Sequence, residues 1–357
     1  MSDTLTIQSH KGPYAVHFEE DALERLDADV PANAHFIVDS YVADLYADRL
    51  RNVLASPSVL RLEARESSKT LDRFPDYVTY LVGKGIRRDH RFIAIGGGII
   101  QDITCFLSAT MLRGVPWTFY PTTLLAQADS CIGSKSSINA GAAKNIMGTF
   151  TPPAEIHLST RFLDTLAEVD VRSGVGEILK VHAIAGPDQF DALAADYDRL
   201  FTDRDTMIRY IRAALAIKLP YIEEDEFDRG PRNIFNYGHS FGHAIEAATE
   251  FAVPHGIGVT MGMDMANFVA ARLDGGNGET FARMHPTLRK NYRGFEDHTV
   301  PLDALLAALS KDKKNTGSGT ATVILPGTDG RVAKQTRPLD DTFAGLCDEF
   351  LRDGRRQ

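Results

Sequence analysis

The chain has 357 residues, of which 43% are hydrophobic and 24% charged, and its formal net charge is −9. These values are typical of a globular protein large enough for two domains or one large α/β unit, and they exclude a disordered or fibrous chain. The excess of 48 acidic over 39 basic side chains argues against nucleic acid or an anionic membrane as the main partner, while a small anionic substrate stays compatible with it.

Short apolar runs alternate with amphipathic stretches over the first 150 residues. We predict buried strands over residues 35–39, 91–95 and 117–120. A helical face of apolar residues follows the first strand over 42–54, and a glycine turn at 96–98 leads from the second strand into a helix over 99–112. Strands that alternate with helices predict a parallel sheet covered on both faces.

Long helical stretches dominate after Pro152-Pro153. We predict helices over 160–185, 188–224, 234–250 and 255–274, then a helix from Asp303, a hairpin over 320–330 and a closing helix. The pattern indicates an α/β domain over residues 1–155 and a mainly α-helical domain over residues 156–357. The cleft between two domains is the default place for a functional site.

The three cysteines, Cys105, Cys131 and Cys347, are odd in number and irregularly spaced. This pattern argues against a disulfide framework and is typical of a reducing cytosol. The first residues lack the basic start and apolar run of a signal peptide, and no run approaches the ~18 apolar residues of a membrane span. We therefore expect a cytoplasmic, unprocessed protein.

The glycine turn Gly96-Gly97-Gly98 is the first candidate for ligand binding. Glycines between a strand and a helix let backbone N–H groups approach a phosphate at the positive end of the helix. The run is not the dinucleotide fingerprint GxGxxG, and a tight turn that needs a positive φ explains it equally well.

A second candidate is the stretch 121–145, which is rich in hydroxyl groups and small side chains and contains Lys135 and Lys144. It lacks the apolar periodicity of a core element. Hydroxyls and lysines suit hydrogen bonds to sugar hydroxyls and phosphates. The alternative interpretation is a solvated surface loop.

His239, His243 and His255 form the strongest constellation, together with Glu177 upstream. Histidines at positions i and i+4 share a helix face, with Cβ atoms roughly 5 to 6 Å apart, which suits a metal such as zinc. The Glu of the HExxH protease signature is absent, which disfavours a protein-hydrolysing zinc helix. A single histidine would be explained as a packed core residue, but three within 17 positions favour a metal.

Basic residues accompany this constellation in the sequence: Lys180, Lys218, Arg229, Arg232 and the run Lys311-Asp312-Lys313-Lys314. Each one taken alone is explained as a solvated surface charge. Together with a metal they would form a pocket for phosphate or carboxylate.

In this combination the chain resembles the 3-dehydroquinate synthase family of sugar phosphate cyclases, in order over nearly its whole length. The motifs that carry the resemblance are Glu66-Ser67-Ser68-Lys69, Gly96-Gly97-Gly98 with Asp102, Leu112-Arg113-Gly114, Pro121 through Gln127 with Asp129 and Lys135, Lys144-Asn145, Glu177 with Lys180, Arg232-Asn233, Asn236 through His243, His255-Gly256 and Asp312-Lys313-Lys314.

The resemblance implies an enzyme that holds NAD and a divalent metal, usually zinc with cobalt as the alternative. Members of the family close a phosphorylated sugar acid into a carbocycle by transient oxidation, phosphate elimination, return of the hydride and an aldol step. By position, Glu177, His239 and His255 would be the metal ligands. The family places the residue that corresponds to His243 on the substrate side. This replaces the interpretation of His243 as a metal ligand, which rests on helix spacing alone.

The resemblance also implies two further sets of residues. The NAD site would be lined by Asp39, Glu66, Lys69, Gly97, Gly98, Asp102, Thr122, Thr123, Asp129 and Lys144. The substrate would be held by Lys135, Asn145, Lys180, Lys218, Arg232, Asn236, His243 and one of Lys313 or Lys314, with Arg113 reaching the phosphate from the other domain or from a partner subunit. Fixed cations among these substrate residues would stabilise the charge that develops during elimination. Homodimers are usual in the family.

The substrate expected from the resemblance is 3-deoxy-arabino-heptulosonate 7-phosphate, because Lys218 and Arg232 match the family's carboxylate-binding pair. A neutral sugar phosphate such as sedoheptulose 7-phosphate is the alternative, since Ser134 and Ser136-Ser137 stand where Gly and Thr-Gly are common and Asp228 where Glu is usual. Two other classes stay open: a metal-dependent alcohol or polyol dehydrogenase, which would accumulate NADH, and a ligand-binding protein without catalysis.

Overall fold

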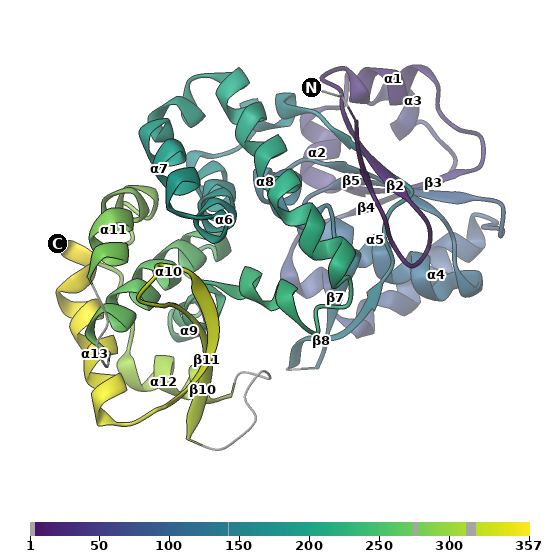
Figure 1. The fold of residues 1–357 in the computed structure, drawn as a ribbon. Helices are drawn as coiled ribbons and strands as arrows, with labels where there is room; N and C mark the ends of the chain where they lie inside the picture. Colours follow the sequence, from purple (N-terminus) through teal and green to yellow (C-terminus); the bar gives the residue numbers. More distant parts are fainter. Residues whose placement is uncertain (1–3, 142, 274–277, 312–318) are drawn as a thin grey trace. The chain divides into compact units, whose positions relative to one another are not determined.

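The structure is a computed structural model that describes residues 4–141, 143–273, 278–311 and 319–357. By its internal contacts the chain divides into two compact units, one of Met1–Leu166 with Leu219–Phe227 and one of Ala167–Lys218 with Asp228–Gln357 (Figure 1). The sequence places the boundary after residue 155, which falls inside the strand Glu155–Leu158. The return of segment 219–227 to the first unit has no counterpart in the sequence pattern.

The first unit is built on a seven-stranded sheet in the order β1-β2-β9-β6-β5-β3-β4. Every neighbouring pair is parallel except the edge pair of β1 and β2, which is antiparallel. The strands are β1 (Thr4–Ile7), β2 (Tyr14–Phe18), β3 (Ala34–Asp39), β4 (Val59–Leu62), β5 (Arg91–Gly96), β6 (Trp117–Pro121) and β9 (Glu155–Leu158). The three predicted strands are therefore confirmed as β3, β5 and β6 of a mostly parallel sheet.

Helices cover both faces of this sheet, as the alternation of strands and helices predicts. They are α1 (Ala22–Ala28), α2 (Ser40–Leu45), α3 (Arg51–Leu54), α4 (Phe74–Gly83) and α5 (Gly98–Thr110). Phe36 and Val38 of β3 share one core with apolar side chains of α1 to α3. The chain leaves β3 toward β4 but leaves β5 toward β6, in the opposite direction, so right-handed crossovers place α2 and α3 on one face and α5 on the other.

The predicted helix over 42–54 is wrong in its continuity, because α2 ends at Leu45 and α3 begins at Arg51. Asp27 explains the second start. Its carboxylate Oδ1 accepts hydrogen bonds from the backbone N–H groups of Asn52 at 2.7 Å and Val53 at 2.9 Å. A carboxylate that satisfies the first N–H groups of a helix fixes where that helix begins.

A separate antiparallel hairpin of β7 (Lys135–Ala140) and β8 (Ala143–Phe150) completes the described part of the first unit. The stretch 121–145 is thus neither a core element nor a simple loop. Residues 131–134 are buried, whereas the described residues of β8 are exposed over most of its length. The alternative of a solvated surface loop therefore holds for β8 and is wrong for residues 131–134.

The second unit is mainly helical. Its helices are α6 (Glu168–Ala185), α7 (Pro187–Ala195), α8 (Arg204–Glu224), α9 (His239–Ala248), α10 (His255–Arg272), α11 (Glu279–Asn291), α12 (Leu302–Ser310) and α13 (Asp341–Arg352), with the hairpin of β10 (Thr320–Pro326) and β11 (Val332–Pro338). The last residues of α8, from Leu219, belong to the first unit. Four predicted helices are found: those around 160–185, 234–250 and 255–274 and the one from Asp303 correspond to α6, α9, α10 and α12. The predicted helix over 188–224 divides into α7 and α8. The sequence pattern does not predict α11. None of the described helices is long and apolar enough to span a membrane.

Helix α10 is the centre of this unit, and it packs against α6, α9, α11 and α13. Its residues from Gly256 to Val269 are all buried, as expected for a helix enclosed on all sides. Glycines bring its backbone unusually close to its neighbours. A Cβ atom on Gly256 would lie 1.9 Å from the carbonyl oxygen of Ser173 on α6, and one on Gly262 would lie 2.1 Å from the carbonyl oxygen of Gly238 before α9.

Candidate functional site

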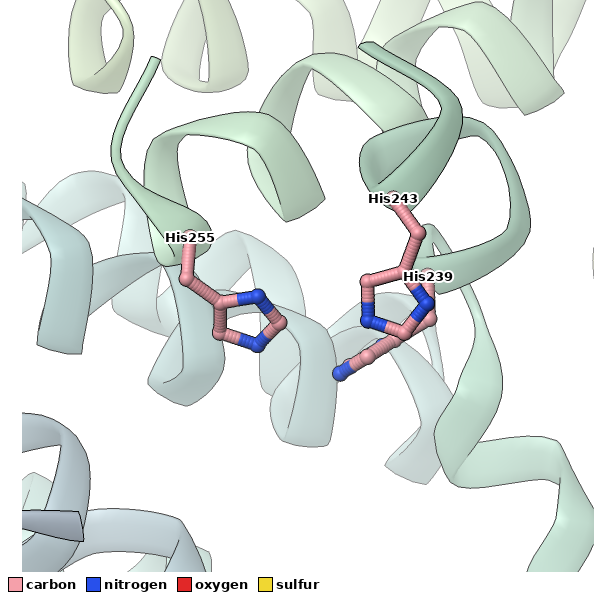
Figure 2. A group of neighbouring side chains, drawn as sticks. All are labelled: His239, His243 and His255. Carbon is pink, nitrogen blue, oxygen red and sulfur yellow. The ribbon is translucent and has the colours of Figure 1, made fainter. Parts of the chain in front are cut away.

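Three histidines gather in the helical unit at the starts of α9 and α10. His239 is the first residue of α9 and His243 follows one turn later, while His255 is the first residue of α10 after Pro254. Figure 2 shows the rings of His239 and His243 projecting from one helix toward the ring of His255. One ligand nitrogen from each ring lies within 4.8 Å of the others.

Glu177 of α6 completes this group with a carboxylate that is almost fully buried. Its Oε1 lies 3.6 Å from Nε2 of His239 and 3.4 Å from Nε2 of His255. Two atoms bound tetrahedrally at about 2.0 to 2.1 Å from a zinc ion are about 3.3 to 3.4 Å apart. The distances from Glu177 to the two histidines therefore match the spacing that a small divalent cation requires, and the donor set of one carboxylate and two imidazoles suits zinc or cobalt.

The charges around this group favour a cation. Burial by itself would raise the pKa of Glu177, but Lys180 and His255 outweigh burial and hold this pKa far below its usual range. Burial by itself would lower the pKa of His255, but the carboxylates of Glu177 and Glu246 outweigh it and raise that pKa to about 10. Glu177, which faces Nε2 of His255, would equally attract a metal ion to that side of the ring.

One predicted substrate residue of the helical unit, Lys180, lies directly beside the same carboxylate. The Lys180 ammonium is 2.5 Å from Oε2 of Glu177, and it lies 6.0 Å from the centre of the Phe235 ring. The Lys218 ammonium lies 6.0 Å from the centre of that ring as well. Lys180, Lys218 and Arg232 are all buried, so this unit holds three cationic side chains away from solvent.

The remaining predicted substrate residues are less concentrated. Asn236 ends the short helical turn Pro231–Asn236, and its amide donates to the carbonyl oxygen of Asn233. Lys135 is exposed on β7 of the α/β unit. Arg113 adopts a left-handed backbone with φ 66°. Lys313 and Lys314 lie outside the described residues.

The predicted cofactor residues of the α/β unit cluster at the carboxyl ends of β3, β5 and β6. Asp39 ends β3, Gly97 and Gly98 follow β5, and Thr122 and Thr123 follow β6. The strands β3 and β5 are neighbours from which the chain departs in opposite directions, and such a switch point is where open α/β sheets bind ligands. The five residues are thus placed where a dinucleotide would bind.

Local contacts at this edge leave room beside the start of α5. A Cβ atom on Gly97 would lie 2.8 Å from Cγ2 of Thr123, whereas one on Gly98 would have no neighbour within 4 Å. Asp39 Oδ1 accepts a hydrogen bond from the backbone N–H of Tyr41 at 3.0 Å, and burial raises the pKa of Asp39. Space for a small group is therefore left beside Gly98 at the positive end of α5, where a phosphate would be favoured.

A second cofactor-side cluster centres on Lys69, whose ammonium is buried. It donates to Oδ2 of Asp102 and to Oδ1 of Asn145, both at 2.9 Å, and lies 3.4 Å from Oε1 of Glu66. Burial raises the pKa of Asp102 although Lys69 acts against it. The structure thus brings together Glu66, Lys69 and Asp102, and it adds Asn145, which the resemblance assigns to the substrate. Of the other predicted cofactor residues, Asp129 lies in the helical turn Ala126–Ser130 and Lys144 is exposed on β8.

Comparison with known proteins identifies the family of this chain. Residues 59–173 match the model of the 3-dehydroquinate synthase N-terminal domain, and residues 174–315 match the model of the C-terminal domain. The 3-dehydroquinate synthase of Agrobacterium fabrum is 33% identical over 335 residues, which cover 90% of this chain and 87% of the relative. This chain belongs to the 3-dehydroquinate synthase family. The resemblance carried by the sequence motifs is therefore confirmed.

Solved structures confirm the fold class of this 3-dehydroquinate synthase family member. A 2-epi-5-epi-valiolone synthase from Streptomyces hygroscopicus subsp. jinggangensis, with NAD+ and Zn2+ bound, has a TM-score of 0.82 at 24% identity and covers 96% of this chain and 97% of its own. A 2-deoxy-scyllo-inosose synthase, complexed with carbaglucose-6-phosphate, NAD+ and Co2+, has a TM-score of 0.81 at 24% identity, covering 98% of this chain and 99% of its own.

The sequence does not single out two polar residues, Glu246 and Asn139, that contact predicted site residues in the structure. Glu246 bonds to His255, and its position three residues after His243, on the same face of α9, is a signal that helical periodicity could have given. Asn139 bonds to two members of the Lys69 cluster: its amide donates to Oε1 of Glu66, and its Oδ1 accepts from the backbone N–H of Asn145. Asn139 lies in the candidate stretch 121–145, but its contacts in this cluster depend on the pairing of β7 with β8 and cannot be deduced from the sequence pattern.

Proposed function

We propose that the protein is a 3-dehydroquinate synthase that converts 3-deoxy-arabino-heptulosonate 7-phosphate into 3-dehydroquinate and phosphate. The product would feed the shikimate pathway of aromatic amino acid biosynthesis. The observation that carries the proposal is the distance of Glu177 from His239 and from His255, which suits a tetrahedral cation, with the Lys180 ammonium directly beside Glu177. Membership of the family supplies the reaction type.

NAD is the proposed redox cofactor. Asp39, Gly97, Gly98, Thr122 and Thr123 would form its site, because they lie at the carboxyl ends of adjacent parallel strands. The backbone N–H groups at the start of α5 would hold its phosphates, and the Asp39 carboxylate would accept from a ribose hydroxyl. The lysine cluster of Lys69, Asp102 and Glu66 would fix the loops on the other side of α5.

Zinc is the proposed metal, with cobalt as the alternative. When bound, it would polarise the substrate hydroxyl that is oxidised, as a Lewis acid. Glu177 would bring a full negative charge to it, since its pKa is held far below the usual range. Lys180 would keep the second oxygen of that carboxylate in place, so that one oxygen stays directed at His239 and His255.

The substrate would be a dianionic phosphate that also carries a carboxylate. Lys218 and Arg232 would bind the carboxylate, and their burial supports this role, because a charged group held away from water interacts more strongly with an opposite charge. His243, Asn236 and Asn145 would hold substrate hydroxyls, while Lys135, Arg113 and one of Lys313 or Lys314 would provide further hydrogen bonds to the phosphate end.

The test is phosphate release by purified protein supplied with NAD, zinc and 3-deoxy-arabino-heptulosonate 7-phosphate. We expect stoichiometric phosphate without net change in absorbance at the NADH wavelength, because the hydride returns to the product. Release only with sedoheptulose 7-phosphate would reassign the protein to a sister cyclase. Accumulation of NADH in step with turnover would identify a polyol or alcohol dehydrogenase.

We also propose a cytoplasmic homodimer. The dimer is supported by its frequency in the family, and the compartment by the three cysteines, which are buried free thiols. Light scattering on the purified protein measures the mass of the particle, and a single-chain mass would refute the dimer.

A further inference from the structure

Glu246 makes a direct contact with one of the proposed metal ligands from the side that faces away from the metal position. Its Oε1 lies 2.8 Å from Nδ1 of His255. The residue is buried near the end of α9, and its Cγ and Oε1 lie so close to Gly258 of α10 that a Cβ atom there would be 3.3 Å from each. The carboxylate is therefore held between the two helices that carry the histidines.

This contact decides which ring nitrogen of His255 carries a proton. An ionised carboxylate only accepts hydrogen bonds, so Nδ1 must be the donor toward Glu246. A histidine binds a metal in its neutral form, which has one N–H and one lone pair, so the lone pair of the metal-binding ring belongs to Nε2. Nε2 is the atom that lies 3.4 Å from Oε1 of Glu177, which is the side on which the metal is expected.

We propose that Glu246 is the positioning residue of the metal site: it fixes the ring orientation and tautomer of His255 so that Nε2 faces Glu177 and His239. The inference rests on the proposed function for the location of the metal, and it adds a residue that does not touch the metal. A carboxylate behind a metal-binding histidine makes the imidazole a better ligand and is worth 10- to 100-fold in metal affinity.

His239 provides an internal contrast. Its Nδ1 lies 3.3 Å from the backbone carbonyl oxygen of Tyr237, so its orientation depends on the backbone at the start of α9. The orientation of His255 depends on a charged side chain that substitution can remove. Glu246 is therefore a point at which metal affinity can be altered without changing a ligand.

The experiment compares Glu246→Gln with wild type and with the control Glu250→Gln. Glu250 is exposed just after α9, so the control loses the same charge from the same end of the helix. Zinc and cobalt affinities of the metal-free proteins are measured by competition with a chromophoric chelator, and the visible spectrum of the cobalt forms reports the ligand geometry. Thermal unfolding of the metal-free proteins shows whether each variant is folded.

We expect zinc binding by Glu246→Gln to weaken about ten-fold, because an amide oxygen still accepts from Nδ1 but makes a weaker hydrogen bond than a carboxylate. Glu246→Ala should approach a 100-fold loss with a changed cobalt spectrum, and Glu250→Gln should stay within about two-fold of wild type. Affinities of both Glu246 variants within two-fold of wild type would overturn the role of Glu246. Because the readout is binding and not turnover, wild-type protein that binds zinc but releases no phosphate would overturn the proposed function alone.

Discussion

Replacement of Gly176 by alanine tests whether close helix packing sets the metal geometry. Gly176 precedes Glu177 on α6, and a Cβ atom added there would lie 2.4 Å from the carbonyl oxygen of Gly256 and 2.5 Å from Oγ1 of Thr260. Gly256 follows His255. The new methyl group, on the residue before Glu177, would therefore press on the backbone of α10 at the residue after His255.

The size of the displacement follows from the contact distances. Real Cβ atoms essentially never come closer than 3.0 Å to such an atom, so the 2.4 Å contact must open by about 0.6 Å. Metal–ligand distances are held to about 0.2 Å, so a shift three times larger should break the match between Glu177 and His255. The overpacking itself should cost about 1–3 kcal/mol in the free energy of unfolding.

The assay measures the unfolding temperature of the metal-free protein and its zinc affinity. We expect Gly176→Ala to lower both, the affinity by at least ten-fold. Gly345→Ala is the matched control, because Gly345 lies inside α13 with nothing within 4 Å of an added Cβ. The control should gain up to about 1 kcal/mol from helix propensity and leave zinc binding unchanged. A Gly176→Ala protein as stable as wild type, with the same zinc affinity, would refute the packing argument.

Three further predictions concern the cofactor, acid stability and the substrate. Gly98→Ala should not lower the unfolding temperature, since an added Cβ meets nothing within 4 Å, but should weaken NAD binding by calorimetry at least ten-fold; unchanged affinity would place the phosphates elsewhere. Burial by itself would raise the pKa of Glu226, but hydrogen bonds from Ser134 and His10 outweigh it and keep this pKa below its ordinary 4.5. The ionised Glu226 therefore stabilises the fold above about pH 4.5, and this stabilisation is lost as the pH falls through the folded pKa. The unfolding temperature of Glu226→Gln should thus lie below that of wild type by an amount that shrinks on acidification, and a difference that grows would contradict this sign. Lys218→Met should raise KM for the heptulosonate substrate about 10- to 100-fold, because a charged hydrogen bond is worth roughly 1.5–3 kcal/mol, and an unchanged KM would remove Lys218 from the carboxylate site.

The sequence predicts the elements whose apolar pattern is set by burial on both faces. Strands β3, β5 and β6 are almost fully buried, so their continuous apolar runs and the glycine or proline that ends two of them were visible. The hairpin of β7 and β8 was not visible, because hydroxyl, lysine and glycine residues fill it. Its register depends on cross-strand pairing, including Gly148, where a Cβ atom would lie 2.2 Å from the carbonyl oxygen of Ser136.

The candidate site was predictable where spacing along one helix determines proximity. The separation of His239 and His243 by four residues placed both on one face of α9, as Figure 2 shows. Contacts that depend on tertiary structure were not predictable from spacing. Ser134 is an example: its left-handed backbone, with φ 67°, directs its hydroxyl to the Glu226 carboxylate at 2.5 Å. Segment 219–227, which carries Glu226, reads as a helix end and gives no sign that it belongs to the α/β unit.

Each side chain of the histidine group is the immediate neighbour of a glycine at a close helix contact. Glu177 follows Gly176, His239 follows Gly238, His243 follows Gly242 and His255 precedes Gly256. Glutamate and histidine side chains are short, so their tips approach to about 3.5 Å only if the backbones that carry them approach too. Helices that pack through larger side chains stay 8–10 Å apart, whereas these glycines leave no room for even a methyl group. The glycine beside each of the three proposed ligands is therefore as much a requirement of the metal site as the ligand itself, and replacing Gly176, Gly238 or Gly256 should weaken metal binding.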